Sequence, residues 1–363
     1  TPFRFPKKRP EAAPGAFPAL AMRWAFGLAC LTLSLVLKGC RVTENIEATI
    51  NGPKRLGSFL AIGDWGWDSE SHGNLGSKHC QQLVADAMHR ELQNLGDVRF
   101  VINVGDSFYP DGVRNKSDPQ WEEKWRQIYS PEVRGVPWYS VYGNHDYHAD
   151  PCACSDDLEH CAQINGDITD LNFFFMPDFS WFKEHSDLDT EVIALDTNYY
   201  NWLNLTCPHT DCPDLCRANL RRRGEAALEL FFRRVERSQA SNLVVFSHYT
   251  TDYFPGGWNE SIPLMTWSPS WLRMSEDEFP TWRNFLPELS NASRPSITYF
   301  GGHRHNVDTD TVASTFPHTN WVTGGGAGWS IDGEDQGFVV GEIFEGGKVN
   351  TYSVIVNITD CMS

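Results

Sequence analysis

Residues 100–109 read FVINVGDSFY, an apolar run that ends in Asp106 and Tyr109. Four further segments have the same form, in which polar side chains follow a short apolar run. They are FLAIGDWG (59–66), YSVYGNHDY (139–147), VVFSHY (244–249) and YFGGHRHN (299–306). Short apolar runs bounded by turn residues are typical of buried β-strands. The polar side chains of all five segments are therefore expected where strands end.

Seven of these polar residues are of types that bind metal ions. Taken singly, a Gly-Asp pair after a strand is more often a turn or a cap, and a lone histidine is more often a structural residue. Five such segments in succession favour instead a centre for two adjacent cations, about 3.5–4 Å apart, with one aspartate bound to both. Carboxylate, amide and imidazole donors suit Mn, Fe or Zn, and a phenolate favours Fe(III). The candidate ligands are Asp64, Asp106, Tyr109, Asn144, His248, His303 and His305.

The segments between these motifs alternate between helical and extended patterns. Residues 76–93, 119–129 and 217–238 are predicted helices, and this alternation with strands predicts a parallel sheet with reactive loops at the carboxyl ends of its strands. Residues 320–323, 337–344 and 349–356 alternate like antiparallel strands. Residues 150–189 break the pattern and are interpreted as an insertion or a loop-rich flap.

The first residues have the pattern of a targeting signal. After Met22, Arg23 and Trp24 comes AFGLACLTLSLVL, thirteen apolar or small residues, which is short for a membrane span. A cleaved secretory signal is the preferred interpretation over an uncleaved anchor. We therefore expect residues 1–39 to lie outside the fold, with no stable membrane span, and the protein to be secreted or lumenal, including a lysosomal or vacuolar destination.

Charge and cysteine content agree with secretion. Beyond residue 38 the chain holds 24 basic and 46 acidic residues, a net charge of −22 that repels phosphate backbones and excludes a nucleic-acid partner. Eight cysteines, an even number, remain after the signal and Cys40 are set aside, and disulfides are favoured for them over a zinc site. The sequence does not assign the pairs. The eight cysteines are Cys80, Cys152, Cys154, Cys161, Cys207, Cys212, Cys216 and Cys361. N-glycosylation motifs begin at Asn115, Asn204, Asn259, Asn291 and Asn357.

With these residues the chain resembles the metallophosphoesterases and, among them, the purple acid phosphatases of the small, tartrate-resistant mammalian type. GDWGW, GDSFY, GNHDY, SHY and GGHRHN are similar to the motifs of that family, and the resemblance runs from about Leu56 to Val356. It implies an α/β fold, a four-layer α/β/β/α sandwich of two mixed sheets flanked by helices, in a single catalytic domain over residues 54–358. Cys-rich insertions near 150–165 and 205–217 depart from the mammalian pattern.

The resemblance also implies an assignment for each ligand. Fe(III) is expected at Asp64, Asp106, Tyr109 and His305. A second ion, Fe(II), Zn(II) or Mn(II), is expected at Asp106, Asn144, His248 and His303, so that Asp106 bridges the two. His145 is the expected phosphate-binding residue and proton donor to the leaving group, and a loop histidine without a catalytic role is the alternative.

The implied function is a secreted acid phosphatase that hydrolyses phosphomonoesters by attack of a metal-bound hydroxide at a binuclear Fe(III)–M(II) centre. The alternatives are a phosphodiesterase or nucleotide pyrophosphatase with the same centre, and a non-catalytic secreted binding protein with the same fold. SHYTT departs from the family's GHYP, and Arg304 stands where an acidic residue is usual. The sequence leaves the oligomeric state open.

Overall fold

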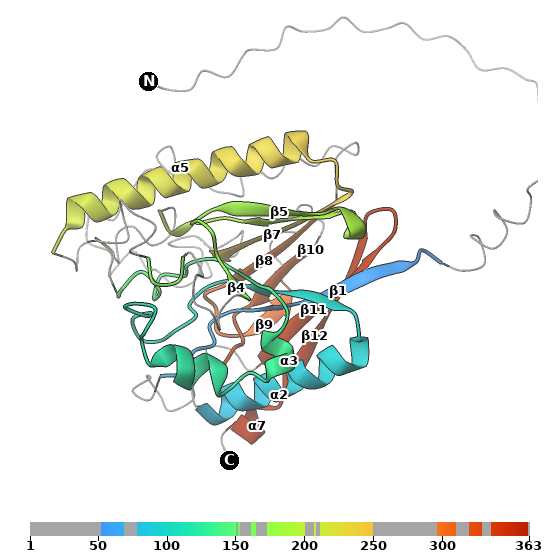
Figure 1. Cartoon of the computed structure of the whole chain (residues 1–363), viewed down its shortest axis with the longest axis horizontal. Helices are drawn as coiled ribbons and strands as arrows, with labels where there is room; N and C mark the ends of the chain where they lie inside the picture. Colours follow the sequence, from blue (N-terminus) through green and yellow to red (C-terminus); the bar gives the residue numbers. More distant parts are fainter. Residues whose placement is uncertain are drawn as a thin grey trace, which may run out of the picture. The chain divides into compact units, whose positions relative to one another are not determined.

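Two β-sheets lie face to face in the part of the chain that the structure, a computed structural model, describes (Figure 1). The described residues are 52–68, 78–149, 152, 161–164, 173–199, 207, 211–249, 296–309, 319–328 and 335–361. The chain divides into two compact units at residue 52, and all described residues except Gly52 belong to the second unit. The expected secretory signal lies outside the described residues.

The first sheet combines strands from both ends of the described chain. Its order is β12-β11-β1-β2-β3-β4. Strands β1 to β4 run parallel, and β11 and β12 are antiparallel to their neighbours. The strands are β1 (Arg55–Ile62), β2 (Val98–Asn103), β3 (Trp138–Ser140), β4 (Phe174–Phe175), β11 (Gln336–Phe344) and β12 (Lys348–Val356).

The second sheet has the order β5-β6-β7-β8-β10-β9. Its four inner strands are parallel, and the two edge strands are antiparallel to their neighbours. The strands are β5 (Trp181–His185), β6 (Thr190–Ala194), β7 (Asn242–Tyr249), β8 (Ser296–Gly302), β9 (Val307–Thr309) and β10 (Thr319–Thr323).

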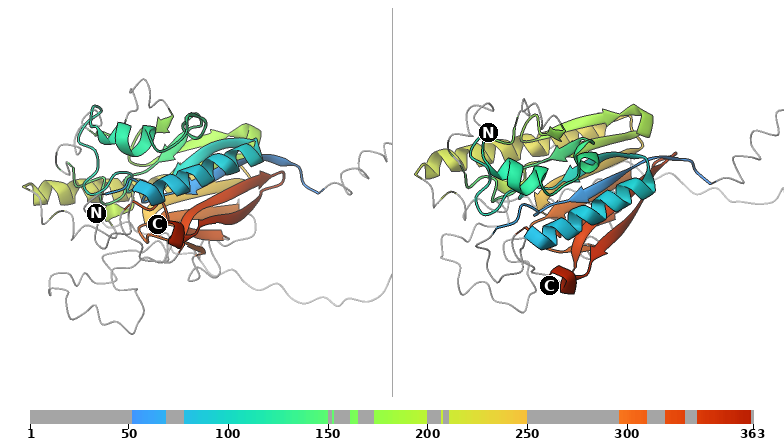
Figure 2. Two further views of the ribbon diagram at one scale, coloured as in Figure 1. Left: turned by 90° about the horizontal axis from the view of Figure 1, so that it is seen from below. Right: turned by 60° about the horizontal axis from the view of Figure 1, so that its bottom comes forward.

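Helices cover the outer face of each sheet, as the two further views show (Figure 2). Helix α2 (Lys78–Leu95), the π-helix η1 (Trp121–Arg126) and α3 (Pro131–Arg134) lie on the first sheet, and α5 (Pro213–Arg237) lies on the second. Helix α2 buries Cys80, Val84 and Met88, which are four residues apart and so share one face. Two short helices, η4 (Ser186–Leu188) and α7 (Ile358–Cys361), complete the described elements.

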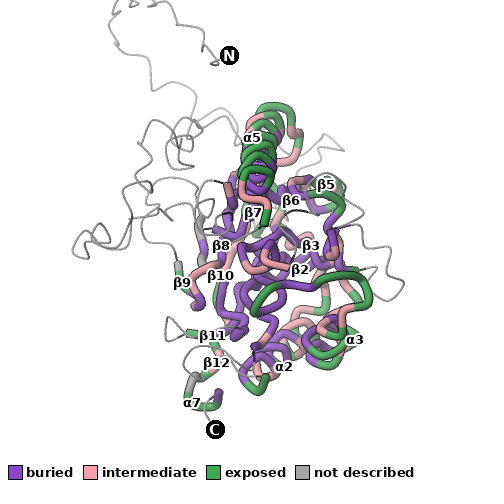
Figure 3. The backbone as a smooth tube through the Cα atoms, turned by 90° about the vertical axis from the view of Figure 1, so that its left-hand side faces the viewer, coloured by how far each residue is buried: buried purple, intermediate pink, exposed green. Residues whose placement is uncertain are grey.

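Three apolar cores separate the four layers. Along β1, Phe59 faces the core between the sheets and Leu60 faces the core under α2, because successive side chains of a strand point to opposite faces. The third core lies between α5 and the second sheet and contains Phe231 and Val245. The strands are largely buried, whereas α5 is exposed along its outer side (Figure 3). The expected four-layer α/β/β/α architecture is confirmed.

Two expectations about the sheets need correction. The helix–strand alternation predicted one parallel sheet core, but the strands divide between two mixed sheets, as the family resemblance implied. The stretch 150–189, interpreted as an insertion or flap, contains β4 and β5. Strand β5 lies at a sheet edge with Phe182, Lys183 and Glu184 exposed, so it lacks the buried apolar run by which the other strands were identified.

Disulfides join the Cys-rich segments, as expected. Helix α2 is tied to α7 through Cys80–Cys361. The start of α5 is held by Cys152–Cys212 and Cys207–Cys216, and Cys161 is also disulfide-bonded. Cys154 lies outside the described residues. None of the helices in the described ranges is long and apolar enough to cross a bilayer.

Candidate metal centre

The carboxyl ends of the parallel strands bring the sequence-predicted residues together. Asp64, Asp106 and Asn144 follow β1, β2 and β3 of the first sheet, whereas His248 lies near the end of β7 and His303 directly follows β8 of the second. Strands that run parallel end at the same edge of a sheet. The centre therefore receives donors from both sheets.

One group of contacts forms around the Tyr109 hydroxyl, which is buried. Its oxygen lies 3.0 Å from Asp64 Oδ1, 3.1 Å from Asp106 Oδ2 and 3.3 Å from His305 Nε2, so its single proton is shared between the two carboxylates. His305 Nε2 is also 3.7 Å from Asp64 Oδ1. These four residues are the set expected at the first ion.

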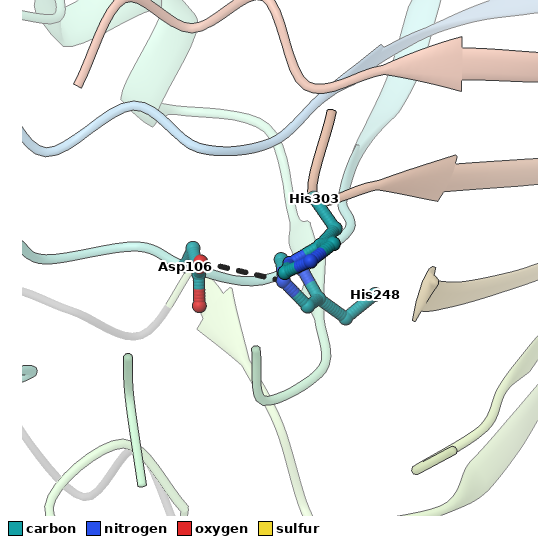
Figure 4. Close-up of side chains that lie close together, drawn as sticks. All are labelled: Asp106, His248 and His303. Atoms are coloured by element: carbon teal, nitrogen blue, oxygen red, sulfur yellow. Dashed lines mark ion pairs between the residues drawn. The ribbon is translucent and has the colours of Figure 1, made fainter. Parts of the chain in front are cut away.

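A second group of contacts forms around the Asn144 amide oxygen. His248 Nε2 and His303 Nδ1 each lie 3.0 Å from Asn144 Oδ1. His248 Nε2 is also 3.3 Å from Asp106 Oδ2, and this ion pair is drawn in Figure 4. Asp106, His248 and His303 each offer one donor atom, and these three atoms all lie within 4.8 Å of one another. These residues are the set expected at the second ion.

Asp106 Oδ2 belongs to both groups. It faces the Tyr109 hydroxyl on one side and His248 Nε2 on the other. A carboxylate in this position can bridge two cations.

The backbone around the ligands adopts conformations that few side chains tolerate. Asp64, Asp106 and His303 have φ values of 57°, 48° and 68°. Non-glycine residues in this left-handed region are uncommon and often mark functional sites. Glycines permit the loops to approach: Gly105 has a φ of 97°, and a Cβ on Gly143 would lie 2.1 Å from Asp106 Oδ1.

Burial and the charges of neighbouring groups shift the pKa values of several ligands at the centre. Burial, strengthened by Asp106 against the opposing charge of His248, raises the pKa of Asp64 well above its ordinary value. Burial and the two carboxylates raise the pKa of the Tyr109 phenol. Burial alone would lower the pKa of His248, but Asp106 outweighs it and raises the pKa to about 9. Burial and the His248 charge lower the pKa of His303.

These observations test whether the residues fit metal ions. Two carboxylates share a buried space, and the pKa of Asp64 is raised there first by burial and further by the charge of Asp106. Cations between them would offset both effects, and the mixture of oxygen and imidazole donors suits Mn, Fe or Zn. The donor set fits two ions that share Asp106.

His145 lies beside this cluster rather than within it. Its backbone N–H donates to Asp106 Oδ1 at 2.8 Å, and its Nδ1 is hydrogen-bonded to the carbonyl oxygen of Pro110. Its ring packs 4.7 Å from the ring of Tyr109 and 5.0 Å from that of His148. His145 is half-buried, so it is accessible to solvent beside the shared carboxylate.

Asp146 is a functional candidate that the sequence reasoning missed. It is buried, with Oδ1 accepting from the Ser107 N–H at 3.0 Å and Oδ2 from the Gly143 N–H at 2.9 Å. Burial, with Asp106 nearby, raises the pKa of Asp146 to about 7. Its neighbour Tyr147 donates to the buried carboxylate of Asp196. The available signal was the position of Asp146 within GNHD.

Several known proteins share part of this sequence. The family model described as calcineurin-like phosphoesterase matches residues 57–307, more than half of the chain. Purple acid phosphatase 3 of Arabidopsis thaliana is 32% identical over 155 residues, which cover 40% of this chain and 38% of that protein. Tartrate-resistant acid phosphatase type 5 of Sus scrofa is 32% identical over 121 residues, 33% of this chain and 34% of that protein. The chain thus spans less than two thirds of the length of these relatives.

A solved structure of similar fold is described as "GAP50 the anchor in the inner membrane complex of Plasmodium". It has a TM-score of 0.51 and 19% sequence identity, and the match covers 83% of this chain and 89% of that one. At this identity the likeness concerns the fold alone. The purple acid phosphatases share sequence with this chain over limited segments.

Proposed function

This chain belongs to the calcineurin-like phosphoesterases, and from that premise we propose that it is an acid phosphatase that hydrolyses phosphomonoesters at a binuclear metal centre. The observation that carries the proposal is the placement of Asp106 Oδ2, 3.1 Å from the Tyr109 hydroxyl and 3.3 Å from His248 Nε2. Partial identity to purple acid phosphatases supports the choice of a monoester substrate.

The ligand assignment follows the two groups of contacts. Asp64, Asp106, Tyr109 and His305 would hold Fe(III), because a buried phenol among carboxylates suits a hard, highly charged ion. Asp106, Asn144, His248 and His303 would hold Fe(II), Zn(II) or Mn(II). Two such ions supply a coordinated water of lowered pKa and neutralise phosphoryl oxygens.

His145 is the proposed proton donor to the leaving group. Its backbone N–H fixes it beside Asp106, and packing against Tyr109 limits the position of its ring. Because the ring is half-exposed, it can regain a proton from solvent after each turnover. A general acid of this kind contributes about 10²–10⁴-fold to the rate.

The role of His145 can be separated from that of the ligands by varying the leaving group. His145→Gln should slow hydrolysis of an alkyl phosphate far more than that of p-nitrophenyl phosphate, whose leaving group departs without a proton. Metal content should stay at the wild-type level. Equal losses on both substrates would contradict the assignment.

An oxidising, extracellular or lumenal location is also proposed. Buried disulfides at Cys80–Cys361 and Cys207–Cys216 support it, since such bonds persist in oxidising compartments. Two glycosylation motifs lie at exposed residues: Asn115, whose Oδ1 accepts from Ser117 N, and Asn357, whose Oδ1 accepts from Thr359 Oγ1. Both are accessible to a glycan.

One assay tests the function as a whole. The protein from a secretory expression host should be examined for iron and zinc content, visible absorbance, and rates on a phosphomonoester and a diester at pH 5 and 7. We expect two metal ions per chain and a faster monoester reaction at pH 5. Diester preference would support the diesterase alternative, and metal-free inactive protein the binding alternative.

A further inference from the structure

Two loops of the candidate centre hold each other through a reciprocal pair of carboxylates. Asp106, in the loop after β2, accepts from the backbone N–H of His145 at 2.8 Å. Asp146, in the loop after β3, accepts from the backbone N–H of Ser107 at 3.0 Å. Each carboxylate thus accepts a hydrogen bond from the residue next to the other aspartate in the sequence. The position of one loop fixes that of its neighbour.

Asp146 is the member of this pair that has no proposed metal ligation. Its second oxygen accepts from Gly143 N at 2.9 Å, directly before Asn144. Asp146 therefore orients the backbone next to Asp106 and the backbone next to Asn144. Any group that fixes the Asp146 carboxylate fixes both ligands indirectly.

Gln163 is such a group. Its side-chain Nε2 donates to Asp146 Oδ1 at 2.7 Å, and its backbone N–H lies 3.4 Å from the Tyr142 hydroxyl. Gln163 is 2% exposed, so this amide contacts Asp146 away from solvent. It belongs to the described segment 161–164, whose first residue, Cys161, is buried and disulfide-bonded. A tether two residues away limits the movement of Gln163.

We propose that Gln163 is a positioning residue of the metal centre, which the Cys-rich segment delivers to Asp146. The inference rests on the proposed function, because it assumes that Asp106 and Asn144 bind metal. Without the Gln163 amide, Asp146 Oδ1 keeps only the Ser107 N–H among the contacts described here, in a buried space that also contains the charge of Asp106. A carboxylate held by fewer donors in such a space orients its neighbours less strictly. Residues that orient metal ligands affect affinity by about 10–100-fold.

Two substitutions at one position distinguish positioning from packing. Gln163→Met keeps the length of the side chain and removes the donor. Gln163→Glu keeps its shape and places a carboxyl group where the amide donor lies 2.7 Å from Asp146 Oδ1. The glutamate variant should also bind metal more weakly than wild type, because a second carboxyl group then replaces the amide donor beside Asp146.

A matched control is available in Gln81, which is equally buried. Its Nε2 donates to the carbonyl of Lys124 at 2.9 Å, and its Oε1 accepts from Trp67 N at 3.3 Å. Neither partner lies next to Asp106 or Asn144 in the sequence, and Lys124 contacts the carbonyl of Tyr109 through its ammonium group, not through the backbone carbonyl that Gln81 binds. Gln81→Met therefore loses a similar buried amide without loosening the Asp106–Asp146 pair.

The experiment measures Zn(II) dissociation constants by competition with a chelator, on protein shown to be folded by circular dichroism. We expect a loss of about 10–100-fold for Gln163→Met, a loss for Gln163→Glu as well, and a change within about twofold for Gln81→Met. In metal-free protein, hydrogen exchange of residues 105–109 and 143–148 should be faster in Gln163→Met than in wild type or Gln81→Met.

Wild-type affinity in Gln163→Met, with unchanged exchange, would overturn the inference, and so would equal losses in Gln163→Met and Gln81→Met. A wild-type protein that binds no metal would instead refute the proposed function. Exchange in the metal-free protein would still show whether Gln163 holds the two loops. The two failures are therefore distinguishable.

Discussion

Asparagine in place of Asp106 tests the shared carboxylate most directly. The substitution preserves shape and removes the negative charge. In the metal-free protein, the pair Asp106 Oδ2–His248 Nε2 at 3.3 Å is worth about 5 kcal/mol at an effective dielectric constant of about 20, before desolvation is subtracted. The pKa of His248, about 9 in the native protein, should therefore fall toward or below its ordinary value of 6.5.

The effect on metal binding distinguishes a bridge from an ordinary ligand. Substitution of residues that only orient ligands costs about 10–100-fold in affinity, so loss of a ligand should cost at least about 100-fold, or about 2.7 kcal/mol, for each ion that it binds. Asp106→Asn should weaken the binding of both ions. Asp64→Asn should weaken the binding of only the ion near Tyr109, and Asn144→Ala should weaken the binding of only the other ion.

The assay is metal content by mass spectrometry after dialysis against a chelator of graded strength. Far-ultraviolet circular dichroism confirms that each variant is folded. We expect Asp106→Asn to release both ions at chelator strengths at which each of the other variants retains one. The reasoning fails if Asp106→Asn keeps one ion with wild-type affinity.

Tyr109→Phe should remove the visible absorbance of the iron-loaded protein while the fold is retained, and a coloured variant would contradict phenolate ligation. In metal-free protein the free energy of unfolding should fall as the pH rises from 7 to 8. Folded His248, with a pKa of about 9, keeps a proton that the unfolded chain has lost, which contributes about 1.4 kcal/mol per pH unit, and Asp146, whose pKa is raised to about 7, acts in the same direction. Urea titrations measure this slope, and a rise over that interval would contradict it. The lowered pKa of Lys124, about 8, acts in the opposite direction, and increasingly so above pH 8. Replacing both Cys80 and Cys361 by serine should cost about 2–5 kcal/mol of unfolding free energy, and an unchanged urea midpoint would show that this disulfide does not constrain the unfolded chain.

The strands and their polar ends could be predicted because their signals are local. An apolar run followed by glycine and a polar residue marks β1, β2 and β8 without reference to the rest of the chain. The structure places Asp64, Asp106 and His303 within three residues of the ends of these strands. Helix α2 was equally clear, since its buried residues recur at helical spacing.

The division into two sheets could not be predicted from these patterns. Strand β1 pairs with β2, close in sequence, and with β11, near the end of the chain. The inner strands of both sheets are similarly apolar, so composition does not say which strands become neighbours. The resemblance to a known family supplied that information.

The supporting contacts of the site were also beyond local analysis. Asp146 gains its meaning from the N–H groups of Ser107 and Gly143, and one of these lies in another loop. Gln163 has no motif at all, because its partner is a carboxylate brought close only by folding. Ligand types can be read from a sequence, but the groups that hold them still are selected by tertiary geometry.

The origin of the donors in different sheets has a mechanical consequence. Asp64, Asp106, Tyr109 and Asn144 come from the first sheet, and the three imidazoles come from the second. Cations bound among them would link the two sheets, so that moving one sheet against the other would require coordination bonds to break. A metal concentration of about 100 times the dissociation constant would add about 2.7 kcal/mol to the free energy of unfolding for each site. Removal of the metal by a chelator should therefore weaken the packing of the two sheets as well as abolish activity.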